Sequence, residues 1–113
     1  MLERGHLAGT WPAGWRLCAI AADDGQRLGV TGNSYGGYLS AWLVSTTDRF
    51  RAAVIENPVT DLVAMYGTSD ISHTFGELQW GGDPRTARAW YDAHSPSTFA
   101  HQATTPTLIL HGE

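Results

Sequence analysis

One serine stands among glycines in the stretch TGNSYGG, and this stretch limits what the chain can fold into. Gly32 precedes Ser34, and Gly36 and Gly37 follow it. A loop that only has to turn needs a single Gly, Asn or Asp. Glycines on both sides of one residue indicate a crowded and strained backbone around it. The apolar run RLGVTG leads into the serine, and the helical pattern YLSAWLVSTT leads away from it. The sequence therefore predicts a strand, a sharp turn and a helix.

The rest of the chain repeats this alternation of strand and helix. Three short apolar runs predict buried strands, at Arg27 to Gly32, Ala52 to Asn57 and Thr107 to His111. Apolar residues at helical spacing predict a helix at Tyr38 to Thr47, and two further helices are expected at Leu62 to Tyr66 and Thr86 to His94. Asp61 is the expected N-cap of the second helix, and Ser95 and Pro96 are expected to end the third. Apolar strands separated by helices indicate an α/β fold with a parallel sheet.

Length, composition and charge exclude several classes of protein. The chain has 113 residues, which suffice for one modest domain, and 42% of them are apolar, as in globular proteins. A net charge of −4 without a basic cluster argues against nucleic acid or an anionic membrane as a partner. The apolar stretch Leu17 to Ala22 is far shorter than the roughly 20 residues of a membrane span, and short for a secretory signal. We expect neither membrane insertion nor export.

The single cysteine and the spacing of histidines, carboxylates and glycines bear on the cellular compartment and on possible cofactors. Cys18 is the only cysteine, so an internal disulfide is excluded, and a buried thiol fits a cytoplasmic, reducing compartment. Histidines and carboxylates show no ligand spacing such as H-E-x-x-H, and neither phosphate-loop nor dinucleotide glycine pattern is present. We expect no metal and no cofactor. Residues 1–25 show no lasting periodicity and are predicted to be irregular, with a short helix at Leu17 to Ala22.

The order strand, Gly-x-Ser-x-Gly, helix is the setting of a nucleophile elbow. The chain reverses there within a few residues, so side chains at Gly32 and Gly36 are expected to clash with neighbouring backbone. The turn aims the Ser34 hydroxyl over the carboxyl ends of the strands, where open α/β sheets bind ligands. The N–H of Tyr35 then lies at a helix N-terminus, where it can stabilise an oxyanion. The simpler interpretation is a glycine-rich turn that carries a surface serine.

Beyond the elbow, a longer series of motifs resembles one family. RLGVTGNSYGGYLSAWLVSTTDRFRAAV, NPV, YGTSDI, GGDP, HSPSTFA and TPTLILHGE follow one another from Gln26 to the end. This series resembles the catalytic domain of the prolyl oligopeptidase family, particularly its acylaminoacyl-peptidase-like branch. The resemblance implies part of an α/β-hydrolase fold and a serine peptidase that acts on peptide or acyl-peptide substrates through an acyl-enzyme.

The resemblance also implies roles for individual residues. Ser34 would be the nucleophile and the Tyr35 N–H an oxyanion donor, within the elbow built by Gly32, Gly36 and Gly37. Val59 would begin the wall of the substrate pocket, with Leu62 and Tyr66 as further pocket residues. The resemblance does not indicate the oligomeric state.

The base and the acid of a catalytic triad are not identified in the sequence. In α/β hydrolases the acid follows the serine and the histidine comes last. The resemblance places the acid just after HGE and the histidine further on, and it makes His111 structural. Glu113 is not expected to be the acid. We therefore expect residues 1–113 to be a fragment of one catalytic domain, with residues 1–25 matching the family poorly.

Two alternatives remain open from the residues alone. The same elbow serves ester hydrolysis, so a carboxylesterase-like α/β hydrolase is one. A catalytically inactive fragment or interaction module is the other, because a serine without its base is a poor nucleophile. The flanking coding sequence would distinguish them.

Overall fold

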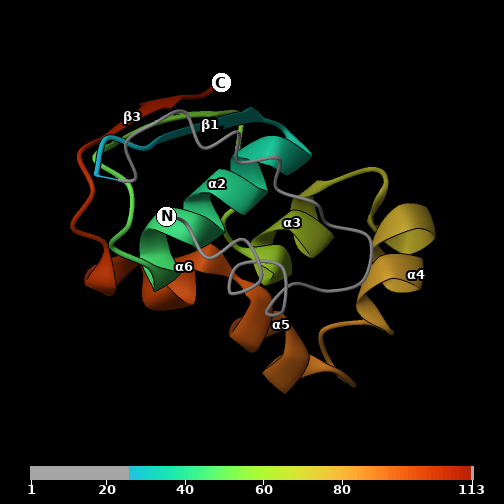
Figure 1. Cartoon of the computed structure of the whole chain (residues 1–113). Helices are drawn as coiled ribbons and strands as arrows, with labels where there is room; N and C mark the ends of the chain where they lie inside the picture. Colours follow the sequence, from blue (N-terminus) through green and yellow to red (C-terminus); the bar gives the residue numbers. More distant parts are fainter. Residues whose placement is uncertain (1–25, 113) are drawn as a thin grey trace.

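Three parallel strands form one sheet in the order β1-β2-β3 (Figure 1). The computed structural model describes residues 26–112, the side chains at 75 and 76 excepted. The expectations for Leu17 to Ala22 and for Cys18 lie outside this range. The strands are β1 (Gly29–Asn33), β2 (Ala52–Glu56) and β3 (Thr107–Leu110). Each lies within two residues of its predicted bounds, because short apolar, β-branched runs favour strands. The predicted burial is correct only for β2, since no residue of β1 or β3 is buried among the described residues.

Helix α2 (Tyr35–Thr46) connects β1 to β2 and covers one face of the sheet (Figure 1). Side chains alternate along β2, so Ala53 and Ile55 are buried towards α2 while Ala52 is exposed. Ala41 and Val44 of α2 complete this core. The helix starts three residues earlier than the pattern predicted, because it continues directly from the turn at the serine.

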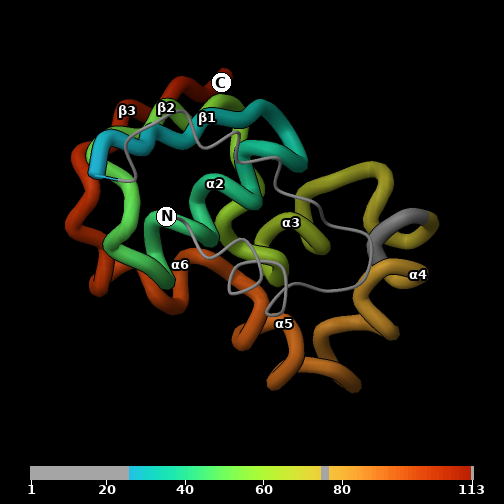
Figure 2. Tube along the Cα trace, viewed as in Figure 1, coloured from blue at the N-terminus to red at the C-terminus, as the bar shows by residue number. Residues whose placement is uncertain are grey.

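A series of short helices connects β2 to β3 and lies on the same side of the sheet as α2 (Figures 1 and 2). Its members are α3 (Leu62–Thr68), the π-helical η1 (Ser72–Gly76), α4 (Glu77–Trp80), α5 (Arg88–His94), α6 (Pro96–Phe99) and η2 (Ala100–Gln102). Within residues 26–112, no helix is long and apolar enough to cross a membrane.

Local polar contacts set the ends of these helices. Asp61 Oδ1 accepts the Ala64 N–H at 3.0 Å, so the predicted N-cap of α3 is confirmed. Helix α5 starts two residues later than predicted, since Asp83 Oδ1 accepts the amides of Arg85 and Thr86 and holds them in a turn. Pro96 does more than end α5: it begins α6, because proline suits the first position of a helix.

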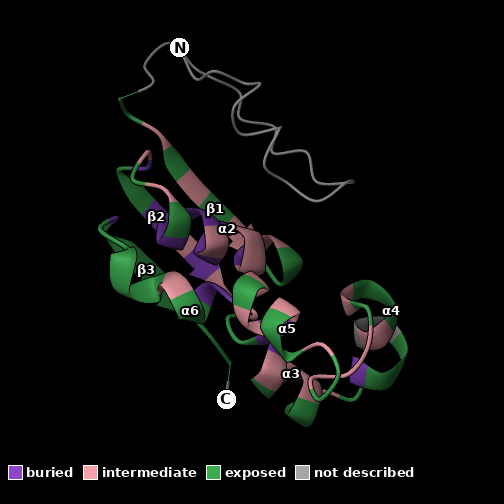
Figure 3. Ribbon diagram, turned by 90° about the horizontal axis from the view of Figure 1, so that it is seen from below, coloured by how far each residue is buried: buried purple, intermediate pink, exposed green. Residues whose placement is uncertain are grey.

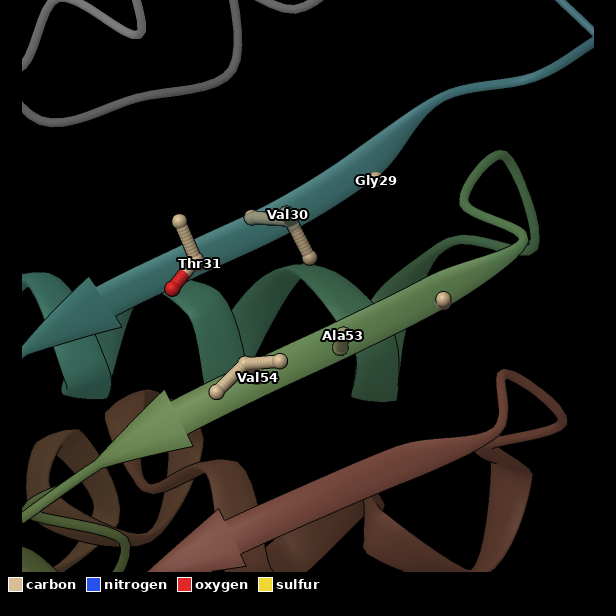
Figure 4. A pocket seen from close by; sticks show the side chains of 6 residues that line it. Gly29, Val30, Thr31, Ala53 and Val54 are labelled. Carbon is tan, nitrogen blue, oxygen red and sulfur yellow. The ribbon is translucent and has the colours of Figure 1, made fainter.

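The face of the sheet away from α2 is open among the described residues. All four residues of β3 are exposed, whereas buried residues gather between α2 and β2 (Figure 3). A shallow apolar hollow lies between β1 and β2, where small residues such as Gly29 and Ala52 are paired (Figure 4). Ser34 does not line this hollow.

Candidate active site

Ser34 lies between the end of β1 and the start of α2, with its side chain exposed. Its backbone has φ 59° and ψ −115°, a positive-φ conformation that is strained for a residue with a Cβ atom. Two hydrogen bonds hold it there. The Ser34 N–H donates to the Glu56 carbonyl at 3.0 Å, and the Ser34 carbonyl accepts the Tyr38 N–H at 2.9 Å. This is the geometry of a nucleophile elbow at the carboxyl edge of the sheet.

The glycines around Ser34 differ in how close the neighbouring backbone lies to the position that a Cβ atom would occupy. A Cβ atom at Gly32 would overlap the Gly36 carbonyl and lie 2.9 Å from the Gly36 Cα. A Cβ atom at Gly37 would lie 2.5 Å from the Glu56 carbonyl oxygen. A Cβ atom at Gly36 would meet no described atom within 4 Å, so the clash expected there is wrong. The Gly36 backbone is the obstacle to a side chain at Gly32, while the Cβ position of Gly36 itself meets none of the described atoms.

Tyr35 is the first residue of α2, so its N–H belongs to the positive end of the helix dipole. The first turn of α2 contains no acidic residue that would neutralise this end. The Tyr35 ring lies 5.8 Å from the ring of Tyr38, whose hydroxyl donates to the His94 carbonyl at 2.6 Å. Burial raises the pKa of both phenols, so both are neutral at pH 7. The start of α2 therefore favours a developing negative charge.

The three residues expected to form a substrate pocket lie in different environments. Val59 is half-buried and follows Pro58, whose Cα would lie 3.1 Å from a Cβ atom at Gly37. This segment is thus adjacent to the elbow. The Leu62 side chain is only 2% exposed, and the Leu62 N–H donates to Ser95 Oγ at 2.9 Å. Leu62 therefore belongs to the interior of the described chain.

Tyr66 belongs to a polar cluster that the sequence patterns did not reveal. The Tyr66 hydroxyl donates to Glu77 Oε1 at 2.7 Å and lies 3.2 Å from His73 Nδ1. The bond to Glu77 raises the pKa of Tyr66 to about 12 and holds the pKa of Glu77 below its ordinary value. His73 and Glu77 are four residues apart, and this helical spacing was the only signal of the cluster in the sequence.

No histidine within residues 26–112 is hydrogen-bonded to Ser34. His94 Nδ1 lies 2.8 Å from the Trp90 carbonyl, and its ring stacks on the Trp90 ring at 4.0 Å. His111 Nδ1 lies 2.7 Å from the Gly112 carbonyl oxygen. In the same part of the chain, no group of three or more His, Cys, Asp or Glu side chains could hold a metal ion. The described site thus consists of a strained serine and a helix N-terminus.

Comparison with known proteins agrees with this geometry. The model of the prolyl oligopeptidase family matches residues 19–113. An uncharacterized peptidase, YuxL, of Bacillus subtilis is 42% identical over 92 residues, which cover 80% of this chain and 14% of that protein. The acylaminoacyl peptidase of Pyrococcus horikoshii superposes with a TM-score of 0.70 at 32% identity, over 78% of this chain and 14% of that one.

A further solved structure holds a ligand. It is an acylaminoacyl peptidase in complex with Z-Gly-Gly-Phe-chloromethyl ketone, and it matches with a TM-score of 0.70 at 33% identity, again over 78% of this chain and 14% of that one. The chain thus spans about one seventh of the length of the proteins that it matches. Its sheet and helices are part of an α/β-hydrolase fold, and the chain belongs to the prolyl oligopeptidase family.

Proposed function

We propose that residues 1–113 are part of the catalytic domain of a longer serine peptidase, which cleaves peptide or acyl-peptide bonds through an acyl-enzyme on Ser34. One observation carries this proposal: in a chain of this family, Ser34 is held in a strained, positive-φ conformation at the start of α2. Such strain persists only where the surroundings enforce it, and it clusters at reactive residues. The peptide-derived ligand of the matching acylaminoacyl peptidase favours a peptide substrate over a simple ester.

The proposed chemistry follows from the position of each group. Ser34 Oγ attacks the carbonyl carbon of the scissile bond, while a general base removes the hydroxyl proton. The carbonyl oxygen gains the negative charge, and the Tyr35 N–H stabilises it. Collapse of this intermediate returns the proton to the leaving amine and leaves an ester on Ser34. Water then cleaves the ester by the same steps, releasing the acid and restoring the hydroxyl.

We propose that the base and its orienting acid come from outside the described residues, because no histidine there is hydrogen-bonded to Ser34. We propose that the coding sequence after Glu113 continues in frame with an Asp within a few residues and a His after a further helix. Unrelated sequence in every reading frame would contradict the proposal of a longer enzyme.

The substrate pocket is proposed to begin at Val59. Pro58 lies against Gly37, so the segment that carries Val59 borders the elbow. Tyr66 offers a neutral phenol fixed by Glu77, and Leu62 supports α3 from the interior. Val59 and Tyr66 are thus proposed to contact the substrate, and Leu62 is proposed to support the pocket wall from behind.

The decisive experiment is to label the protein that carries this chain with a fluorophosphonate, which reacts with activated serines. We expect the label on Ser34, together with hydrolysis of acyl-peptide or aminoacyl-anilide substrates. Ser34→Ala should abolish both, a loss of at least about a thousandfold in hydrolysis. The matched control is Ser97→Ala, which removes an exposed hydroxyl on α6 and should leave labelling and hydrolysis unchanged. Full hydrolase activity in Ser34→Ala would overturn the assignment.

A further inference from the structure

Glu56 contacts the chain before, at and after Ser34. It ends β2 and is paired in register with Asn33, the last residue of β1. Asn33 Nδ2 donates to Glu56 Oε2 at 3.1 Å. The main-chain carbonyl of Glu56 accepts the Ser34 N–H at 3.0 Å, and it is the same oxygen that would lie 2.5 Å from a Cβ atom at Gly37. The position of Ser34 therefore depends on where the end of β2 lies relative to the end of β1.

Neither packing nor strand propensity explains the hydrogen bond between the Asn33 and Glu56 side chains. Both side chains alternate with the core positions, so they lie on the face of the sheet away from α2. Asn33 is exposed and Glu56 half-buried, so packing among residues 26–112 requires neither. Asn and Glu are also poor strand formers, and a β-branched residue would suit either position better. A donor and an acceptor at these two strand ends are thus unexplained by the fold alone.

We propose that Asn33 and Glu56 are positioning residues for Ser34, an inference that rests on the proposed function of this serine. The Glu56 carboxylate accepts a charge-assisted hydrogen bond and fixes the end of β1 against the end of β2. With the two strand ends fixed, the distance between the Glu56 carbonyl oxygen and the Ser34 amide is also fixed. The direction of the Ser34 hydroxyl follows from that distance. A small misplacement of a reacting group has a large effect on rate.

The test exchanges donor and acceptor in the protein that carries this chain. Asn33→Asp places two carboxylates face to face, and we expect kcat to fall about tenfold with KM changed less than about twofold. Glu56→Gln keeps an acceptor oxygen, so kcat should stay within about threefold of the wild type. In the double variant Asn33→Asp with Glu56→Gln, the new amide can donate to the new carboxylate. We expect this reversed pair to recover kcat to within about threefold.

The rate of fluorophosphonate labelling at Ser34 should follow kcat across these variants, because labelling needs the same placement of the hydroxyl. Arg51→Ala is the matched control, since Arg51 Nη2 donates to Gln26 Oε1 at 3.2 Å near the opposite ends of the same two strands. Its kcat should equal that of the wild type. If Asn33→Asp does not fold, Asn33→Ala removes the donor without adding a charge and should lower kcat by about threefold to fivefold.

Two outcomes separate this inference from the proposed function. If Ser34→Ala is inactive while Asn33→Asp and Asn33→Ala keep the wild-type kcat, the positioning role is wrong and the peptidase proposal stands. If the reversed pair stays as slow as Asn33→Asp, the hydrogen bond between the two side chains does not position Ser34, and the inference is wrong. Retained hydrolysis in Ser34→Ala overturns the proposed function itself.

Discussion

Two regions of this protein are held together in different ways. In the sheet unit, residues 29–56, backbone meets backbone: Gly32 lies against Gly36, and Gly37 against the Glu56 carbonyl. In the helical segment, residues 62–102, side-chain hydrogen bonds join elements. Ser95 Oγ accepts the Leu62 N–H at 2.9 Å and donates to the Tyr91 carbonyl at 2.7 Å.

This difference predicts which substitutions each region tolerates. A close backbone contact has no flexible partner that could move aside, so the sheet unit should reject added volume at a few positions. A polar bridge fails when one partner is removed and the other is left without a hydrogen bond. The helical segment should therefore be sensitive to the loss of particular polar atoms, and in one place to pH.

The largest effect is expected for Gly32→Ala. The new Cβ atom would overlap the Gly36 carbonyl, so β1 and α2 must separate at the elbow. We expect a loss of about 3 kcal/mol or more in unfolding free energy, with at least a hundredfold lower labelling of Ser34. Denaturant unfolding and the fluorophosphonate reaction measure the two effects.

The matched control is Gly67→Ala in α3, where an added Cβ atom meets no described atom within 4 Å. Alanine favours the helix by up to about 1 kcal/mol, so this variant should be unchanged or more stable. Equal stability of the two variants would show that the close contact at Gly32 relaxes without cost, and the contrast between the regions would fail.

An intermediate effect is expected for Ser95→Ala. The Ser95 side chain is buried, and its loss leaves the Leu62 N–H without its acceptor. This should cost about 1–3 kcal/mol in unfolding free energy, measured by denaturant unfolding. Thr68→Ala is the control, because it removes an exposed hydroxyl that donates to the Ala64 carbonyl within α3, and it should stay within about 0.5 kcal/mol of the wild type. If Ser95→Ala is as stable as this control, the hydrogen bonds of the Ser95 hydroxyl do not stabilise the helical segment.

The smallest effect concerns Tyr66 and Glu77 and depends on pH. Their hydrogen bond lowers the pKa of Glu77 from 4.5, so its contribution to stability is present above pH 4.5 and is lost as pH falls through the lowered pKa. The pKa of Tyr66 is raised from 10.0 to about 12, so its contribution is present below pH 10.0 and is lost as pH rises through about 12. Tyr66→Phe should therefore lower Tm slightly at pH 7, and this difference should shrink in acid.

Tyr91→Phe serves as the control for that measurement. The Tyr91 hydroxyl donates to the Gly82 carbonyl at 2.7 Å, and this acceptor does not titrate in acid. Its effect on Tm should stay the same between neutral and acid pH. If the difference for Tyr66→Phe is equally constant, the bond to Glu77 is not the source of the effect.

The strands, α2 and the elbow could be predicted because each depends on residues close together in the sequence. Apolar runs at 29–33 and 52–56 favour strands, and Asp61 caps α3 with its own side chain. The helical segment was less predictable. No periodicity in the sequence predicted η1 or α4. Pro96 was expected only to end a helix, but it is also the first residue of α6.

The sequence by itself determined that Ser34 stands in a strained turn between a strand and a helix, since steric limits on φ and ψ act over a few residues. Only the tertiary structure decided what surrounds this turn. Asn33 and Glu56 are 23 residues apart, and the parallel register of β1 and β2 brings their side chains together. In the same way, Leu62 is buried, and its N–H donates to Ser95, which lies 33 residues further along the chain. Such contacts depend on how crossover connections align distant segments, and no local pattern encodes that alignment.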